Sequence, residues 1–220
     1  MKLIPDHKDI NPDHLHGQFA FGIETNLSGT PAMLRLWEYI SNAKENPISK
    51  NGDLAGNISS SLVLNDRDNY FFDNTCIPII EKYREIFEKS QATHSKIVFQ
   101  KNVPYIMDSF WVNFMKQHEF NPMHNHSGVY SFVIFMKIPT VWKEQCEIPF
   151  VKESNSPKAS AFEFVYIDIM GNIRPYTYSL DSSSEGTMLF FPAEMNHQVY
   201  PFYNCEEERI TISGNIVYDI

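Results

Sequence analysis

The sequence has no run of about 18 consecutive apolar residues, so no helix that spans a lipid bilayer is expected. Its amino terminus also lacks the apolar stretch of about 7 to 15 residues that marks a signal peptide, which makes secretion unexpected. The three cysteines, Cys76, Cys146 and Cys205, are an odd number at wide spacing. This pattern argues against a disulfide framework or a zinc knuckle and favours reduced thiols in the cytoplasm.

Positive charge is also scarce: 18 lysines and arginines face 27 acidic residues, a formal net charge of −9. Long-range repulsion from a phosphate backbone therefore makes nucleic acid an unexpected partner. With 220 residues, 43% of them hydrophobic, the chain is long enough to bury a sizeable core. We predict a single domain over residues 1–220, with a helical part at about 1–95 and a β-rich part at about 96–220.

Two helices are predicted in the first part of the chain. The first begins near Ser28 or Thr30 with Pro31 in its first turn, and the apolar residues that recur at helical spacing are Met33, Leu34, Trp37 and Ile40. The second follows Asn74 and Thr75 and is predicted to bury Ile79, Ile80, Tyr83, Ile86 and Phe87 behind a charged face.

After about residue 95, aromatic and β-branched runs alternate with Gly, Pro, Asn and Ser clusters, which is typical of β-strands. Met170, Gly171 and Asn172 are predicted to form a hairpin turn. The fold class predicted is α+β, with N-terminal helices packed on a double-stranded β-helix (jelly-roll) core. Strands are predicted near 96–100, 105–116, 123–138, 161–169, 173–180, 187–192, 196–203 and 208–217.

Three histidines are candidates for one metal site. His124 and His126 are two residues apart, so on an extended chain both rings point to the same face. His197 follows a strand and a proline-containing bend, and a jelly roll brings such distant strand ends together. Imidazole nitrogens suit iron, zinc, copper or nickel. The alternative for His124 and His126 is a surface strand that binds no metal. The histidines for which the sequence offers no convincing partner are His7, His14, His16, His94 and His118.

A candidate anion site lies later in the chain. Alternation places Arg209, Thr211 and Ser213 on one face of a predicted strand. A planar guanidinium can donate to both oxygens of a carboxylate, and a nearby hydroxyl can donate a third bond. Taken alone, Arg209 could instead pair with the acidic run at 206–208.

The ordered set His-x-(Asp or His), a long gap, Phe-Pro-x-x-x-x-His and then Arg-x-x-x-Ser resembles the 2-oxoglutarate and Fe(II) dependent oxygenases. The segments 111–113, 120–128 and 131–133 resemble oxygenases of cyanophages and marine bacteria within that superfamily. The resemblance covers about residues 105–217.

The resemblance implies a dioxygenase that hydroxylates an unidentified small-molecule or peptide substrate and releases succinate and CO2. It implies Fe(II) as the metal, held by His124, His126 and His197. It also implies 2-oxoglutarate as cosubstrate, its far carboxylate bound by Arg209 with help from Ser213 or Thr211. Asn113 and Ser131 are further candidates for contact with the cosubstrate.

At one position the sequence departs from the usual family pattern, because His126 stands where an aspartate is common. Either the three histidines form the site, which we favour, or His126 is the first ligand and Gly128 occupies the carboxylate position, as in related halogenases. Two other functions compete with the oxygenase: a cupin-type three-histidine metalloenzyme, and a noncatalytic jelly-roll module for binding or assembly.

Overall fold

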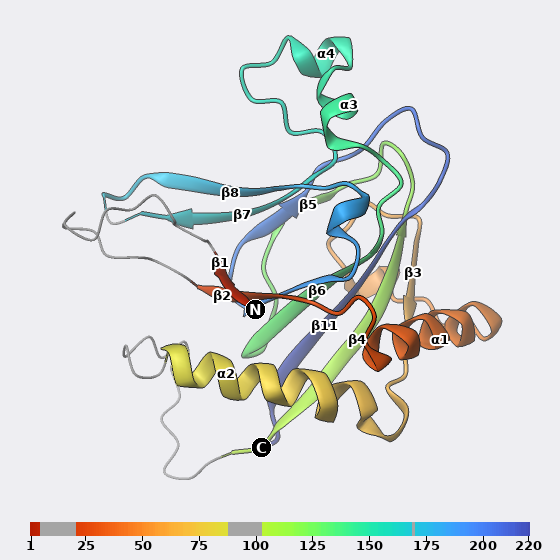
Figure 1. Cartoon of the computed structure of the whole chain (residues 1–220), viewed down its shortest axis with the longest axis vertical. Coiled ribbons are helices and arrows are strands. Elements are labelled where there is room, and N and C mark those ends of the chain that lie inside the picture. Colours follow the sequence, from red (N-terminus) through yellow and green to blue (C-terminus); the bar gives the residue numbers. More distant parts are fainter. Residues whose placement is uncertain (5–20, 88–102, 169) are drawn as a thin grey trace.

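The computed structural model describes residues 1–4, 21–87, 103–168 and 170–220, and consists mostly of two antiparallel β-sheets with a few helices (Figure 1). In spatial order the larger sheet contains β1 (Lys2–Ile4), β2 (Gly22–Asn26), β9 (Thr187–Pro192), β6 (Tyr130–Lys137), β11 (Arg209–Tyr218), β4 (Tyr105–Met115) and β3 (Ser60–Val63). The smaller sheet contains β5 (Asn121–His124), β10 (His197–Val199), β7 (Ala161–Ile167) and β8 (Ile173–Ser179). Consecutive strands of the second half therefore often lie in different sheets.

The first long helix, α1 (Pro31–Glu45), begins where the sequence predicts. The side chain of Thr30 accepts a hydrogen bond from the backbone N–H of Met33, and Pro31 occupies the first turn. Not all of the apolar residues that recur at helical spacing are buried, because Leu34 is 69% exposed and Trp37 39% exposed. The residues that α1 buries are Ala32, Leu36, Tyr39, Ile40 and Ala43.

The second long helix, α2 (Ile77–Phe87), follows a π-helical turn at Phe72–Cys76. Upstream, the carboxylate of Asp66 accepts hydrogen bonds from the backbone N–H groups of Phe71 and Phe72. The predicted apolar face of α2 is confirmed, with Ile86 only partly buried and the fully buried members being Ile79, Ile80, Tyr83 and Phe87.

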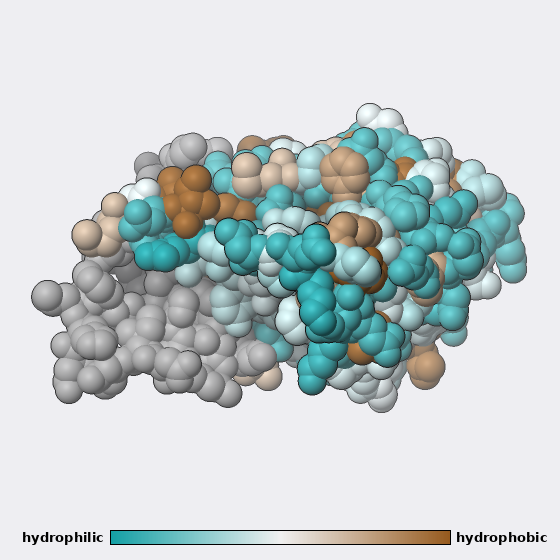
Figure 2. All heavy atoms as spheres, turned by 90° about the horizontal axis from the view of Figure 1, so that it is seen from above, coloured by the Kyte–Doolittle hydropathy of each residue, from teal (hydrophilic) through white to brown (hydrophobic). Residues whose placement is uncertain are grey.

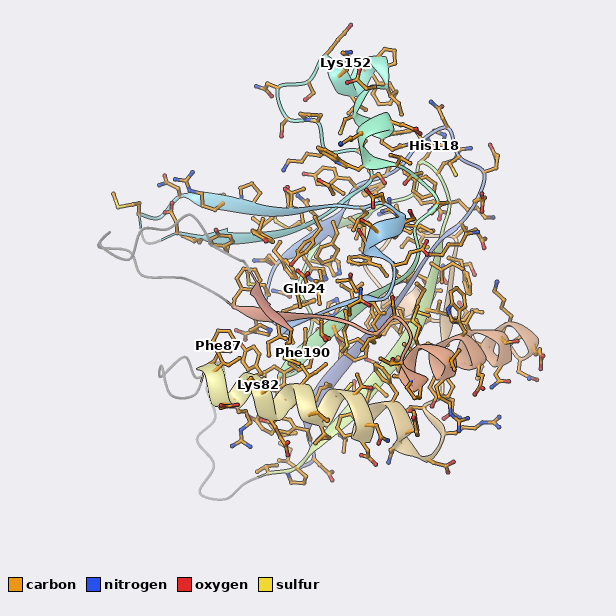
Figure 3. The ribbon with its side chains drawn as sticks, in the orientation of Figure 1. Glu24, Lys82, Phe87, His118, Lys152 and Phe190 are labelled. Atoms are coloured by element: carbon orange, nitrogen blue, oxygen red, sulfur yellow. The ribbon has the colours of Figure 1, made fainter. Side chains whose placement is uncertain are left out.

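Two hydrophobic clusters cover opposite faces of the larger sheet, and strand alternation separates them. On β6, Phe132 and Ile134 belong to the cluster shared with α1 and α2, whereas Val133 and Phe135 belong to the cluster shared with β7. Figure 3 places Phe87 of α2 and Phe190 of β9 in the layer between that helix and the sheet. The side of the larger sheet that faces the smaller one carries both apolar side chains and some polar ones.

Two predictions need correction. The run 123–138 is not one strand: it forms β5 and β6, which belong to different sheets and are joined by residues 125–129. The first part of the chain is not only helical, because β2 and β3 add to the larger sheet. The strand predicted at 96–100 lies outside the described residues. The predicted hairpin turn is confirmed, since Gly171 has a φ of +79° between β7 and β8.

The connection between β6 and β7 contains two short helices, α3 (Trp142–Cys146) and α4 (Pro149–Lys152), which project at one end of the molecule (Figure 1). In the face shown in Figure 2, hydrophilic residues dominate and exposed apolar residues form only small groups. Across the described residues, no helix is both long enough and apolar enough to cross a bilayer.

Candidate active site

A cavity of about 260 Å³ opens between the two sheets. Its walls combine apolar side chains, such as Phe135, Phe162 and Leu180, with polar groups contributed by β4, β5, β10 and β11. The segment Asp53 to Ile58, which precedes the edge strand β3, also lines it. The polar side chains on its wall include His124, His126, His197, Arg209, Thr211, Ser213, Asn113, Asn121 and Asn215.

The three candidate histidines meet at this cavity. Each offers one ring nitrogen, and these nitrogens lie within 4.8 Å of one another. His124 ends β5 and lies opposite His197 of β10 in the strand pairing, while His126 belongs to the connection that follows β5. Backbone pairing therefore fixes two of the rings, and the third reaches them from a separate segment.

Among the residues that the structure describes, the hydrogen bonds of all three rings involve Nδ1 and none involves Nε2. The Nδ1 of His124 donates to the carbonyl oxygen of Pro122 (2.7 Å), and the Nδ1 of His197 donates to that of Met195 (2.9 Å). The Nδ1 of His126 donates to Oδ1 of Asn215 at 2.7 Å. Each Nδ1 therefore carries the ring proton, and each Nε2 keeps a lone pair that can bind a metal ion. Metal-binding imidazoles are usually held through the other ring nitrogen in this way.

Burial keeps the three rings neutral. Desolvation lowers the pKa of His124 below its usual value, and desolvation followed by the nearby His124 lowers the pKa of His126 to about 4. For His197, desolvation and then the other two histidines hold the pKa well below the usual range. Neutral imidazole is the form that binds a metal, so these rings need not lose a proton to do so at neutral pH.

Ser131 has a different place from the one predicted. It is fully buried, its hydroxyl donates to Oδ1 of Asn215 at 2.8 Å, and Nδ1 of His126 lies 3.1 Å from the same hydroxyl. Ser131 thus lies behind His126 and is not among the cavity-lining residues, unlike Asn215. Asn215 was not predicted as a site residue, although it is two residues beyond Ser213 on the same face of β11.

Arg209 is the most unusual side chain in the cavity wall. It is only 1% exposed, and its Nε and Nη1 have no hydrogen-bond partner among the described residues. Its Nη2 donates to Oγ of Ser160 at 2.5 Å and to the carbonyl oxygen of Ser160 at 3.3 Å, and its guanidinium carbon lies 5.0 Å from the ring centre of Phe202. Desolvation lowers the pKa of Arg209 to about 9, which leaves it charged at neutral pH.

The alternative pairing of Arg209 with the acidic run is wrong. Glu206 accepts a hydrogen bond from Gln117 and Glu207 pairs with Lys137, and within the described ranges no ion pair reaches Arg209. A buried cation without a counter-ion is costly, because it has lost its water without gaining a negative partner. The two free nitrogens therefore point to an anion from outside the protein.

The other predicted polar residues accompany Arg209. Thr211 and Ser213 line the cavity, and alternation places Ile210 and Ile212 in the opposite cluster, as predicted. Asn113, on the paired strand β4, accepts a hydrogen bond from Ser61 and donates to Thr211 at 3.4 Å. Together they form a polar strip along one wall of the cavity.

Gly128 does not lie on that wall. Its φ is +119°, and a Cβ there would come within 2.9 Å of the carbonyl oxygen of Ile216. Glycine is thus required at this position by the backbone, whereas His126 lies within the cluster. This geometry favours the three-histidine alternative. Of the other histidines, His118 lies beside Tyr203 and away from the cavity, and His7, His14, His16 and His94 fall outside the described residues.

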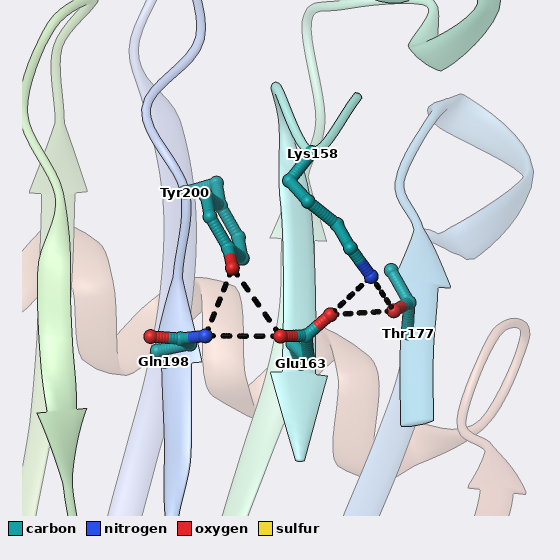
Figure 4. A network of polar contacts seen from close by, with 5 residues as sticks. All are labelled: Lys158, Glu163, Thr177, Gln198 and Tyr200. Atoms are coloured by element: carbon teal, nitrogen blue, oxygen red, sulfur yellow. Dashed lines mark hydrogen bonds and ion pairs between the residues drawn. The ribbon is translucent and has the colours of Figure 1, made fainter. Parts of the chain in front are cut away.

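A buried carboxylate, that of Glu163, joins three strands of the smaller sheet through hydrogen bonds (Figure 4). Glu163 of β7 is 3% exposed and lies opposite Gln198 of β10. Its two oxygens accept hydrogen bonds from Lys158, Thr177, Gln198 and Tyr200. Burial alone would raise the pKa of Glu163, but these hydrogen bonds hold it below its usual value.

Residues 109–215, just under half of the chain, match the model of a family described as "Putative 2OG-Fe(II) oxygenase". The resemblance to 2-oxoglutarate and Fe(II) dependent oxygenases is thereby confirmed over these residues; the resemblance to cyanophage proteins stays a prediction. Among curated proteins, none matches the sequence.

Solved structures give only distant similarities. An oxidoreductase of the 2OG-Fe(II) oxygenase family from Burkholderia pseudomallei is 16% identical with a TM-score of 0.36, over 54% of this chain and 47%, less than half, of the other. A prolyl-4-hydroxylase from Pseudomonas putida is 11% identical with a TM-score of 0.47, over 88% and 90% of the two chains. A prolyl hydroxylase from Trichoplax adhaerens, solved with a hypoxia inducible factor peptide, is 10% identical with a TM-score of 0.47, over 90% and 82%. At this distance they say nothing about substrate.

Proposed function

We propose that the chain is an Fe(II)- and 2-oxoglutarate-dependent dioxygenase that hydroxylates a small-molecule or peptide substrate and releases succinate and CO2. The observation that carries this proposal is the buried Arg209, charged and with two free nitrogens, on the wall of the same cavity that holds three neutral histidines. A metal site and a carboxylate receptor within one cavity suit a chelating diacid.

We further infer that the two sheets form a double-stranded β-helix. From β4 onward, the chain passes from one sheet to the other at every connection except the β7–β8 hairpin, which yields the orders β9-β6-β11-β4 and β5-β10-β7-β8. In this arrangement β5 and β10, which carry His124 and His197, line the same cavity as β11, which carries Arg209.

The residues fit the proposed metal. His124, His126 and His197 would hold Fe(II) through Nε2, and imidazole is a suitable ligand for iron. When bound, Fe(II) with 2-oxoglutarate and dioxygen supplies the oxidative decarboxylation and the oxidation of a substrate C–H bond. The chain itself binds and orients: the two free nitrogens of Arg209 would donate to the far carboxylate, and Thr211 or Ser213 would add a hydroxyl.

Two competing functions account for less of this geometry. A cupin-type metalloenzyme uses the three histidines but gives Arg209 no ligand. A noncatalytic module explains neither the converging Nε2 atoms nor the buried cation, and it predicts that His197→Ala and Arg209→Ala leave every activity unchanged.

The test is iron-dependent formation of succinate from 2-oxoglutarate, measured by mass spectrometry in the presence of dioxygen and pooled small-molecule or peptide substrates. We expect succinate from the wild type and a loss of at least tenfold in His197→Ala. An exposed histidine variant, His118→Ala, is the matched control and should retain activity. Iron-loaded wild type that forms no succinate, or His197→Ala that forms as much, would contradict the proposal.

A further inference from the structure

The guanidinium of Arg209 has a single hydrogen-bonding partner among the described residues, Ser160. Ser160 precedes β7 and is fully buried. Since a guanidinium only donates, the hydroxyl oxygen of Ser160 must accept from Nη2. One nitrogen of the guanidinium is therefore anchored, and the remaining two are left for a ligand.

Ser160 adopts a backbone conformation that is uncommon for a residue with a side chain. Its φ is +60°, in the left-handed region, and in this conformation both its hydroxyl and its carbonyl oxygen contact Nη2 of Arg209. The backbone N–H of Ser160 donates to the carbonyl oxygen of Pro201 at 2.8 Å, which helps to hold the conformation. Strained backbone that neighbouring structure maintains is often found at functional sites.

Thr140 completes the arrangement from another element. It follows β6, is 5% exposed, and its Oγ1 lies 2.8 Å from Oγ of Ser160. This second hydrogen bond, in which either hydroxyl can be the donor, helps to hold Oγ of Ser160 in place. The chain of contacts runs from Thr140 through Ser160 to Arg209, and every member is buried.

We propose that Ser160 and Thr140 are positioning residues that set the selectivity of the cavity for a diacid over a monoacid. By holding Nη2, they would aim Nε and Nη1 of Arg209 at the far carboxylate of the cosubstrate. The proposal rests on the proposed function and extends it, because it assigns the preference for a second carboxylate to residues that do not touch the cosubstrate. The acceptors that contact Arg209 in the described part of the chain are neutral, so they orient the guanidinium without neutralising it.

The experiment compares the binding of 2-oxoglutarate with that of 2-oxobutyrate, which has the same 2-oxo acid group but no far carboxylate. Calorimetry with Zn(II)-loaded protein measures both dissociation constants without turnover. The variants are Ser160→Ala and Ser160→Gly, which both remove the hydroxyl, and Thr140→Val. Ser160→Gly also relieves the left-handed backbone, so agreement between the two Ser160 variants assigns the effect to the hydroxyl.

We expect both Ser160 variants to weaken 2-oxoglutarate binding by about tenfold and to leave 2-oxobutyrate binding unchanged within about twofold, as for loss of one charge-assisted hydrogen bond. Thr140→Val should have a smaller effect in the same direction. Thr140→Ser, which keeps the hydroxyl, should bind 2-oxoglutarate as the wild type does. The exposed Ser156, in the same connection, provides the control Ser156→Ala.

Equal weakening for both acids, or no weakening for either, would overturn the role of Ser160 and Thr140. Wild type that binds neither acid would instead overturn the proposed function. The two failures are therefore distinguishable.

Discussion

His197 lies directly opposite His124 in the pairing of β10 with β5, and the centroids of their imidazole rings are 4.2 Å apart. Each ring donates through Nδ1 to a backbone carbonyl oxygen two residues earlier in its own segment. Backbone geometry therefore orients these two rings. His126 differs, because its Nδ1 donates to a side chain, that of Asn215.

Asn215→Ala should therefore weaken metal binding, although Asn215 is not one of the three predicted ligands. Without Oδ1, the Nδ1 of His126 loses its shortest contact, and the ring can turn or change tautomer. We expect a loss of about 10- to 100-fold in affinity for Zn(II) or Fe(II), measured by competition with a chelator. Asn155→Ala, in an exposed connection, is the control. Unchanged affinity in Asn215→Ala would show that His126 does not depend on this hydrogen bond.

Arg209→Met should stabilise the ligand-free protein while removing its response to the diacid. A buried cation without a counter-ion costs free energy, and an apolar side chain of similar length removes that cost. We expect the free energy of unfolding to rise by about 1–3 kcal/mol in urea titrations. Added 2-oxoglutarate should raise the melting temperature of the metal-loaded wild type only. A variant that is destabilised by several kcal/mol would mean that Arg209 serves the fold.

The buried, hydrogen-bonded carboxylate of Glu163 should make the free energy of unfolding depend on pH. Burial would raise its pKa, but hydrogen bonds hold the pKa in the folded protein below that in the unfolded chain, so between these two pKa values the unfolded chain binds more protons. The free energy of unfolding should fall as pH drops through this window, and the contribution of Glu163 should be fully present above it. Glu163→Gln should be less stable at pH 7 by about 1–3 kcal/mol, with a shallower decline below pH 5. Parallel pH profiles for both proteins would refute this role.

Gly214 of β11 has no room for a side chain. A Cβ at this position would lie 2.5 Å from Cζ of the fully buried Phe132 and 3.0 Å from the carbonyl oxygen of Ser109. Gly214→Ala should therefore destabilise the protein by about 1–3 kcal/mol in thermal or urea unfolding. At Gly52, where a Cβ meets nothing within 4 Å, the same substitution should be nearly neutral. Equal stabilities of the two variants would contradict the packing described for β11.

The sequence was a good guide to the site wherever alternation along a strand decides which side chains share a face. The facing of Arg209, Thr211 and Ser213 follows from that rule, and so does the burial of Ile210 and Ile212. It was a poorer guide where tertiary contacts decide. Residues 123–138 were predicted as one strand, yet the chain leaves the smaller sheet after His124, passes through residues 125–129 and enters the larger sheet at Tyr130.

The supporting residues show the same limit. Ser160 and Thr140 are ordinary loop residues in the sequence, and only the folded chain brings them to Arg209. No local pattern signals the left-handed backbone of Ser160, because glycine or asparagine would be the usual residue there. Asn215 could have been found, since it continues the polar face of β11 by one further step of two residues.

The most direct test of the account is an anaerobic titration of the protein with Fe(II), followed by 2-oxoglutarate, monitored by visible absorption. We predict one iron per chain and a weak charge-transfer band that grows with 2-oxoglutarate and saturates. In Arg209→Met the band should require at least tenfold more diacid. In His197→Ala it should be absent. The central claim is that one cavity joins a three-histidine metal site to a carboxylate receptor. It would be contradicted if the wild type bound no iron, or if the band of Arg209→Met responded to the same concentrations of 2-oxoglutarate as the band of the wild type.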